Sequence, residues 1–235
     1  MANQPKSKLR KEQILRAAEK VFARKGFQEA TISDVAREAK VSEATIYEYF
    51  PSKEELLFSI PGETTRRSKE SMTFLLQFLR GASNKLRAII YHYLWFYETN
   101  PDYAAVAMLI LKQNRKFLEV GAYEDVRELS RILLNIVKEG IDSGEFRADI
   151  NLNLVRAIIL GTVEHLVIRR VLLGKPESLV ELSDSLTDLI IGGIKIRREE
   201  KVWNIQIRQE PEENTPPTEL PSMKKRKPLG DPSHK

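Results

Sequence analysis

Apolar residues recur at helical spacing along most of this chain. Between Thr31 and Phe50, two short helical patterns lie on either side of a tight break. The first, Ile32–Ala39, has apolar residues at positions i, i+3, i+4 and i+7, which form one face of a helix. Thr31 precedes this pattern and Asp34 follows three residues later, a spacing typical of a capping box. We therefore predict that a helix begins directly after Thr31.

A second short helix is predicted at Glu43–Tyr49. Ser42 lies just before it, where a serine hydroxyl can accept a hydrogen bond from an unpaired backbone amide. Because only Lys40 and Val41 remain between the two patterns, the helices must cross steeply. This arrangement is a helix-turn-helix, whose second helix is shaped to enter the major groove of DNA.

The rest of the chain also has helical periodicity, and the sequence predicts an all-α protein. Further helices are expected at about 8–25, 52–79, 84–99, 102–116, 123–143, 152–173 and 178–198. Pro61-Gly62 interrupts the fourth pattern, and a kink or break is expected at Ile60 because proline removes a backbone hydrogen bond. Two interpretations stay open, a hinge and a fixed corner between separate helices.

The N-terminal region resembles the DNA-binding domain of the TetR/AcrR family of bacterial regulators. The resemblance covers about residues 8–68 and rests on some twenty positions at fixed spacing, namely Ala17, Phe22, Gly26, Phe27, Ala30, Thr31, Ile32, Asp34, Val35, Ala36, Ala39, Val41, Ser42, Ala44, Thr45, Ile46, Tyr47, Tyr49, Phe50, Lys53, Glu54 and Leu56. It implies a three-helix head that binds DNA, followed by a helical ligand-binding and dimerisation body at 69–200.

One position departs from the family pattern. Residue 40 is often glycine in that family and is Lys40 here. A left-handed turn at a residue with a side chain costs about 1–2 kcal/mol. We therefore expect a slightly different turn within an intact motif.

The resemblance and the exposed positions of the second short helix together predict a DNA-binding surface. Five residues match family positions that contact phosphate or bases: Ser42, Thr45, Tyr47, Tyr49 and Lys53. From their own chemistry, Glu43 can accept a bond from a cytosine amine, and Ala44 is small enough to meet a thymine methyl. Thr31 and Ser33 place backbone amides near a phosphate. The alternative for the two tyrosines is that they only pack the head.

Charge supports DNA binding only weakly. The net charge is +5, and residues 1–50 hold 10 Lys/Arg against 7 Asp/Glu. The basic residues that precede any acid are Lys6, Lys8, Arg10 and Lys11. They can attract phosphates, although a solvated tail has the same composition. At the other end, 201–235 is rich in proline and charge and is predicted to be a disordered tail.

The last two predicted helices have apolar stripes at alternating spacings of three and four. These stripes are Leu152, Val155, Ile159, Thr162 and Leu166, and then Leu179, Leu182, Leu186, Leu189 and Gly193. Two such helices from each subunit would form a four-helix homodimer interface. The alternative is that the stripes pack inside one subunit.

Residues 82–175 are the candidate ligand domain, where polar and aromatic residues among apolar ones would shape a pocket. The candidates are Tyr91, Trp95, Tyr103, Asn114, Phe117, Tyr123, His165 and Arg169. Each of them can equally be a core or surface residue. The aromatic weighting favours an apolar or aromatic small-molecule effector.

Composition limits the other classes of function. The chain has no cysteine and three histidines far apart, so no metal site or cofactor is predicted. A phosphate loop or hydrolase constellation is not recognisable, which argues against an enzyme. We expect a cytoplasmic protein, since no run is apolar enough for a membrane span. The leading hypothesis is a repressor released from a palindromic operator by its effector, and the alternative is an architectural DNA-binding protein without a ligand.

Overall fold

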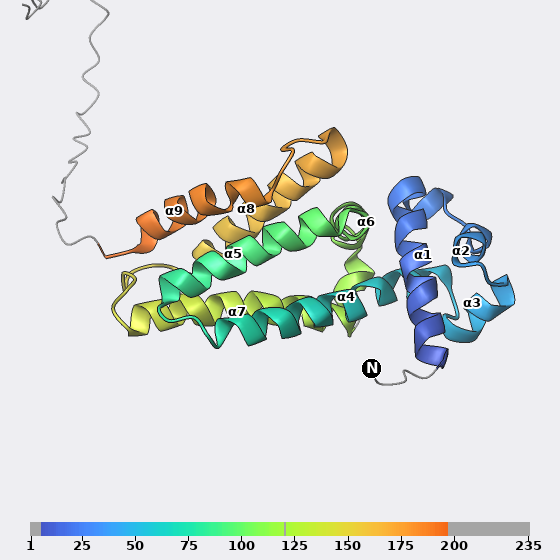
Figure 1. The fold of residues 1–235 in the computed structure, drawn as a ribbon, viewed down its shortest axis with the longest axis horizontal. Coiled ribbons are helices and arrows are strands. Elements are labelled where there is room, and N and C mark those ends of the chain that lie inside the picture. Colours follow the sequence, from blue (N-terminus) through green and yellow to red (C-terminus); the bar gives the residue numbers. More distant parts are fainter. Residues whose placement is uncertain (1–5, 120, 197–235) are drawn as a thin grey trace, which may run out of the picture. The chain divides into compact units, whose positions relative to one another are not determined.

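The computed structural model describes residues 6–119 and 121–196, and all regular elements in these ranges are helical (Figure 1). The predicted all-α fold class is confirmed. The first three helices form the head: α1 (Lys6–Glu29), α2 (Ile32–Ala39) and α3 (Glu43–Tyr49). The bounds of α2 and α3 are those expected from the sequence. None of the helices in these ranges is long and apolar enough to span a membrane.

Apolar side chains from all three head helices meet in one core. Ile14 and Phe22 of α1, Val35 of α2 and Ile46 of α3 are completely buried, and Phe50 closes the core just after α3. Burying one such side chain stabilises the fold by about 1.5–3 kcal/mol. The head is therefore a packed unit that holds α3 in a defined orientation.

The turn between α2 and α3 is defined by its caps. The Asp34 N–H donates to Thr31 Oγ1 at 3.1 Å, and the Thr31 N–H donates to Asp34 Oδ2 at 3.1 Å, which completes the predicted capping box. Lys40 ends α2 with φ 54° and ψ 47°, a left-handed conformation. The expectation of a different turn is wrong, because Lys40 itself adopts the backbone that favours glycine.

Helix α4 (Lys53–Leu76) continues through Pro61 without interruption. The break expected at Ile60 is therefore wrong. Leu56, Leu57 and Ile60 are buried in the core that α4 shares with α1. This packing holds the helix directly before Pro61, and the buried Thr65 holds it one turn after, so tertiary contacts outweigh the local cost of proline.

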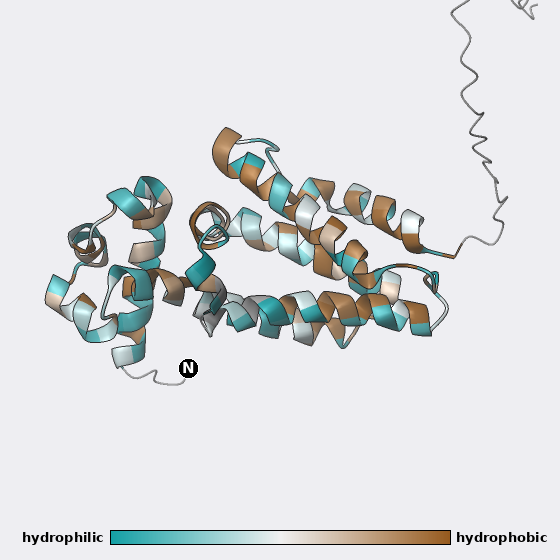
Figure 2. Ribbon diagram, turned by 180° about the vertical axis from the view of Figure 1, so that it is seen from behind, coloured by the Kyte–Doolittle hydropathy of each residue, from teal (hydrophilic) through white to brown (hydrophobic). Residues whose placement is uncertain are grey.

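The body consists of α4, α5 (Ala82–Thr99), α7 (Ala122–Asp142), α8 (Leu152–Leu173) and α9 (Ser183–Ile194). Helices α4 and α7 lie side by side, and α5 packs against α7, α8 and α9 (Figure 1). Hydrophobic segments of these helices face one another in a second core (Figure 2).

Two regions depart from the predicted helices. The helix expected at 102–116 is divided into α6 (Pro101–Val106), a π-helical segment (Ala107–Leu111) and a 3-10 segment (Arg115–Glu119). The wider π turn lets Ala107, Met108 and Leu111 all face the interior. The last helix begins with a 3-10 turn at Val180–Leu182, and α9 ends at Ile194. The predicted tail at 201–235 lies outside the described residues.

The strained turn residue generates a stability prediction. Lys40→Gly should raise the free energy of unfolding by about 1 kcal/mol relative to Lys40→Ala, because only glycine is unstrained at this backbone conformation. Urea unfolding followed by circular dichroism would measure the difference. An alanine variant as stable as the glycine variant would contradict the strain.

Candidate nucleic-acid interface and body cavity

The outer face of α3 presents side chains that the head core does not use. Glu43, Ala44 and Glu48 are exposed, and the ring of Tyr47 is 51% exposed. Ile46 points the other way and is fully buried. Tyr49 is half-buried and packs beside the head core. The helix therefore has one side fixed in the head and one side free to meet another molecule.

The hydroxyl groups at the two helix starts are already hydrogen-bonded inside the head. Ser42 Oγ accepts from the Thr45 N–H at 3.1 Å, and the two side-chain oxygens lie 2.9 Å apart. The amide of Thr31 is bonded to Asp34, whereas Ser33 is exposed beside it. These caps orient the helix starts, and the expected DNA contacts of the same residues stay predictions.

Asp34 is the centre of an ionic cluster that joins α1 to the start of α2. Lys25 Nζ lies 2.8 Å from Asp34 Oδ1, and Arg37 pairs with the same carboxylate. The hydrogen bond from Lys25, followed by those from Thr31, holds the pKa of Asp34 well below its ordinary value. The carboxylate is therefore charged at neutral pH and keeps both cations in place.

Lys53 uses its ammonium group within the head. Lys53 Nζ donates to the carbonyls of Phe27 at 2.8 Å and Ala30 at 2.9 Å, and lies 4.5 Å from the centre of the Phe27 ring. It thus satisfies carbonyls at the end of α1. The predicted phosphate contact of Lys53 is untested, and its removal would also loosen the head.

A cavity of about 800 Å³ lies inside the body, within the range typical of small-molecule sites. Tyr93, Tyr97 and Tyr103 line it, together with apolar side chains such as Leu160. Tyr103 OH is 3.1 Å from Thr65 Oγ1 of α4. In the described part of the chain, no hydrogen bond involves the hydroxyls of the other two tyrosines.

Burial keeps these phenols neutral. It raises the pKa of Tyr103 to about 12 and raises the pKa values of Tyr93 and Tyr97 further. A neutral phenol can donate a hydrogen bond to a carbonyl or phosphate oxygen. The cavity therefore combines apolar walls with hydroxyl donors that are ready to bind a ligand.

Basic side chains line one part of the same cavity. Arg127 and Arg131 both pair with Glu124, and Lys112 pairs with Glu164. Arg156 of α8 also lines the cavity, and it forms no ion pair with any side chain that the structure describes. Its guanidinium is the group best placed to bind an anionic part of a ligand.

The structure brings only some of the predicted ligand residues together. Tyr103 and Tyr123 line the large cavity, and Trp95 lines a smaller one beside it. Sequence reasoning missed Arg156 and Arg127, because basic residues at helical spacing resemble a solvated face. The signal that could have suggested Arg156 is its position one turn from Leu152 and Leu160, as a basic residue within a mostly apolar helix.

The other predicted ligand residues line neither cavity. Tyr91, His165 and Arg169 are exposed, the last two on the outer side of α8. Phe117 packs on Phe58 with ring centres 5.8 Å apart, and Asn114 accepts a hydrogen bond from the Lys116 N–H at 3.0 Å. Tyr91, His165 and Arg169 are directed to the surface by helical rotation, whereas Phe117 is buried in the core outside the cavities.

The predicted dimer stripes divide between the core and the surface. Val155, Ile159 and Leu179 are buried within the subunit, where a second copy cannot reach them. Leu152, Leu166, Leu182 and Leu186 are half-buried, and Gly193 is exposed. Leu189 is 78% exposed and Leu154 59%, with Ile158 also on the outside. On α8 the predicted stripe therefore faces inward, and other apolar residues form the outer face.

A helix-turn-helix head on a helical body with an internal cavity defines a class of DNA-binding transcriptional regulators. Residues 14–60 match the family described as bacterial regulatory proteins, tetR family. Residues 70–193 match the C-terminal region of YsiA-like proteins. The chain belongs to the TetR family of transcriptional regulators.

Two relatives align over nearly their full lengths. The fatty acid metabolism regulator protein of Bacillus subtilis is 32% identical over 77% of this chain and 94% of its own length. The transcriptional repressor KstR2 of Mycolicibacterium smegmatis is 22% identical over 82% of this chain and 93% of its own.

Solved structures show the same fold. FadR of Bacillus subtilis in complex with stearoyl-CoA has a TM-score of 0.73 at 32% identity, covering 78% of this chain and 98% of the other. FadR of Bacillus halodurans has a TM-score of 0.74 at 26% identity, covering 84% and 100%.

The exposed face of α3 leads to a test of DNA recognition. Tyr47→Phe should weaken binding to a DNA fragment selected by the protein from a random pool, by about 0.5–1.5 kcal/mol, since only one hydroxyl contact is lost. Fluorescence anisotropy would measure the affinity. The matched control is Tyr91→Phe on α5, which is 46% exposed and far from the head motif. Equal affinities for both variants would remove the Tyr47 hydroxyl from the interface.

Proposed function

We propose that this protein is a dimeric transcriptional repressor that a long-chain acyl thioester of coenzyme A releases from its operator. The observation that supports this most is the body cavity, which combines apolar walls, neutral tyrosine hydroxyls and the arginine Arg156. An acyl chain suits the apolar part, and phosphates of the nucleotide suit the arginines. The likeness to FadR, solved with stearoyl-CoA, supports the same class of ligand.

In this proposal α3 reads the DNA. Glu43, Ala44 and Tyr47 lie on its exposed face and would meet base edges or the backbone in the major groove. One head reads only a few base pairs, so two heads on one dimer would bind an approximate palindrome. The half-sites would lie about 34–36 Å apart or somewhat farther.

Helix α4 is the proposed connection between cavity and head. It begins at Lys53 in the head, and its Thr65 and Ser68 reach the cavity wall. Both make buried hydrogen bonds to the body, Thr65 to Tyr103 at 3.1 Å and Ser68 to His92 at 2.7 Å. A ligand that takes the Tyr103 hydroxyl would free Thr65 and with it the middle of α4.

The ligand can act only through its different affinity for the two states of the protein. If it disfavours the spacing of heads that fits the operator, the operator must weaken ligand binding by the same factor, typically about 5–150-fold. This reciprocity separates a regulated repressor from a protein whose body binds ligands without effect on the heads.

The dimer interface is proposed on the outer faces of α8 and α9. Leu154 and Ile158 are exposed one turn apart on α8, and Leu189 is exposed on α9. The exposed stripe of α8 continues through His165 and Arg169. An apolar surface on two neighbouring helices suits a four-helix contact between two copies.

The proposed dimer interface can be tested by introducing a charged residue into it. Leu189→Glu should shift the protein from dimer to monomer in sedimentation velocity and abolish tight operator binding, because a carboxylate would be buried without a partner. The control is Phe74→Glu, since Phe74 of α4 is equally apolar and 64% exposed but lies on a different helix pair. A dimeric Leu189→Glu protein would place the interface elsewhere.

The ligand can be tested at Arg156. Arg156→Gln should weaken binding of stearoyl-CoA about tenfold, or about 1.4 kcal/mol, through loss of a charge-assisted hydrogen bond. Arg169→Gln on the same helix is the matched control, because Arg169 is exposed and outside the cavity. Isothermal titration would give both affinities, with the oligomeric state of each variant checked first.

Two outcomes would count against the proposal. Equal effects of Arg156→Gln and Arg169→Gln would show that the cavity arginine does not hold the nucleotide. Tight binding of stearoyl-CoA with unchanged operator affinity would leave the body a ligand carrier that does not control the heads.

A further inference from the structure

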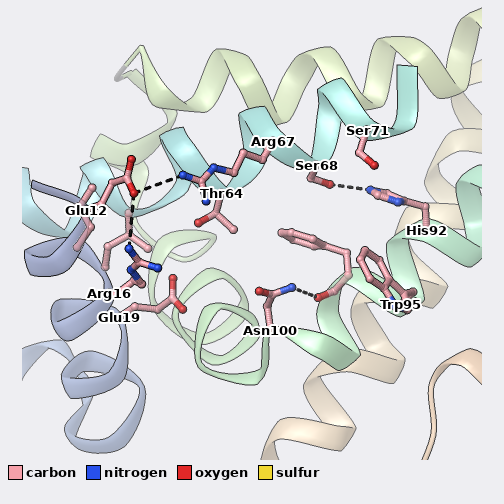
Figure 3. A pocket seen from close by; sticks show the side chains of 13 residues that line it. Glu12, Arg16, Glu19, Thr64, Arg67, Ser68, Ser71, His92, Trp95 and Asn100 are labelled. Atoms are coloured by element: carbon pink, nitrogen blue, oxygen red, sulfur yellow. Dashed lines mark hydrogen bonds and ion pairs between the residues drawn. The ribbon is translucent and has the colours of Figure 1, made fainter. Parts of the chain in front are cut away.

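A second cavity, of about 370 Å³, lies where α1 of the head meets α4 and α5 of the body (Figure 3). Glu12 and Glu19 project from α1 on one side, and Trp95 lies on α5 on the other. Ser68 and Phe96 line both this cavity and the larger one. The two spaces are therefore neighbours with different walls, and the proposed acyl ligand does not account for the smaller one.

The carboxylate of Glu12 forms ion pairs within the protein. Glu12 Oε2 lies 3.6 Å from Arg16 and 3.4 Å from Arg67 (Figure 3). Its other oxygen, Oε1, is buried and has no hydrogen-bond partner among the residues that the structure describes. Both arginines form ion pairs with Glu12, and among the described residues neither forms one with Glu19, the second acid of the cavity.

Glu19 is that unmatched acid. Among the residues the structure describes, no hydrogen bond or ion pair involves its carboxylate, and Asp102 of α6 adds a further negative charge nearby. Burial, followed by the repulsion from Asp102, raises the pKa of Glu19 to about 7. Arg16 lowers this pKa only in part, so burial and the charge of Asp102 together still destabilise the charged form of Glu19.

The opposite wall is aromatic and apolar. Trp95 is exposed although it is large and apolar, and Phe96, Leu15 and Ile60 border the same space. An aromatic face attracts a cation and also packs against hydrocarbon. An unmatched carboxylate opposite such a wall is the chemistry that recognises amines and quaternary ammonium groups.

We propose that this cavity binds an organic monocation, with its ammonium group at Glu19 and its apolar part against Trp95 and Phe96. Two acids and two arginines line the cavity, and Asp102 outside the lining adds one further negative charge that a monocation at Glu19 would balance. The site would join the head helix α1 to α4 and α5, so its occupant would act on the placement of the head directly. The site is separate from the acyl cavity, and the inference stands without the proposed function.

The proposal implies a pH dependence. The other charged or titratable groups around the cavity are Glu12, Arg16, Arg67, His92 and Asp102. Burial lowers the pKa of His92, which keeps it neutral. A cation binds the ionised form of Glu19, so its affinity should rise as pH rises through about 7 and then level off.

Trp95 provides the signal for a direct test. The chain has two tryptophans, so a Trp203→Phe background leaves Trp95 as the only one. The probes are benzyltrimethylammonium, which does not titrate, and benzyl alcohol and benzoate as neutral and anionic counterparts. We expect saturable quenching by the cation and at least tenfold weaker binding after Glu19→Gln. Glu29→Gln, at the exposed end of α1, is the matched control and should change nothing.

Glutamine keeps the shape of neutral Glu19, and circular dichroism would verify its folding. Stearoyl-CoA binding should be unaffected by Glu19→Gln, which keeps this test independent of the acyl cavity. The proposal is overturned if benzyl alcohol binds as tightly as the cation, or if Glu19→Gln leaves the affinity of the cation unchanged. It is equally overturned if benzyltrimethylammonium, phenethylammonium and choline all fail to bind at millimolar concentration, or if binding by the wild-type protein does not vary with pH.

Discussion

The apolar contact of α1 with α6 is the constraint on which the rest of the structure depends. The core of the head does not end at α4, because Tyr103 and Val106 of α6 and Leu111 after it are buried in the same cluster as Ile14 and Phe22. A head with its own closed core could move freely on a flexible connection. Here any shift of α6 or α4 must repack apolar side chains that also hold α1, and close-packed interiors resist such changes. Coupling between body and head is thus built into the packing.

Two polar side chains of α4 are buried beside this core, and each depends on one hydrogen-bond partner that a ligand could replace. Thr65 and Ser68 of α4 are buried and depend on Tyr103 and His92 for their hydrogen bonds. A buried polar group without a partner costs about 1–3 kcal/mol, so a ligand that replaces one of these partners changes the free energy of this arrangement of α4 by a similar amount. The same helix lines both cavities, and Arg156 in one and Glu19 in the other form no ion pair with the described side chains. The two ligands proposed above, one anionic and one cationic, would therefore act on the same helix.

The exposed side of α3, on which the proposed DNA contacts lie, is oriented by local interactions within the head. The Thr31–Asp34 capping box, the cations around Asp34 and the carbonyl contacts of Lys53 orient α2, α3 and the end of α1. They join residues within the head and leave the exposed side of α3 unused. The TetR-family match at residues 14–60 covers this unit, and a separate match at 70–193 covers the body.

The sequence by itself determined the helix-turn-helix, because caps and apolar periodicity act within one or two turns. Thr31, Asp34 and Ser42 mark the starts of α2 and α3 wherever the rest of the chain lies. Only the tertiary structure decided the course of α4 through Pro61, since burial of Ile60 and its neighbours outweighs a lost backbone bond. It also decided which predicted stripe residues are buried. Ile159 of α8 is buried and Leu189 of α9 is exposed, although the sequence placed both on apolar stripes. Helical spacing shows that a face is apolar, but the neighbours that cover it come from distant parts of the chain.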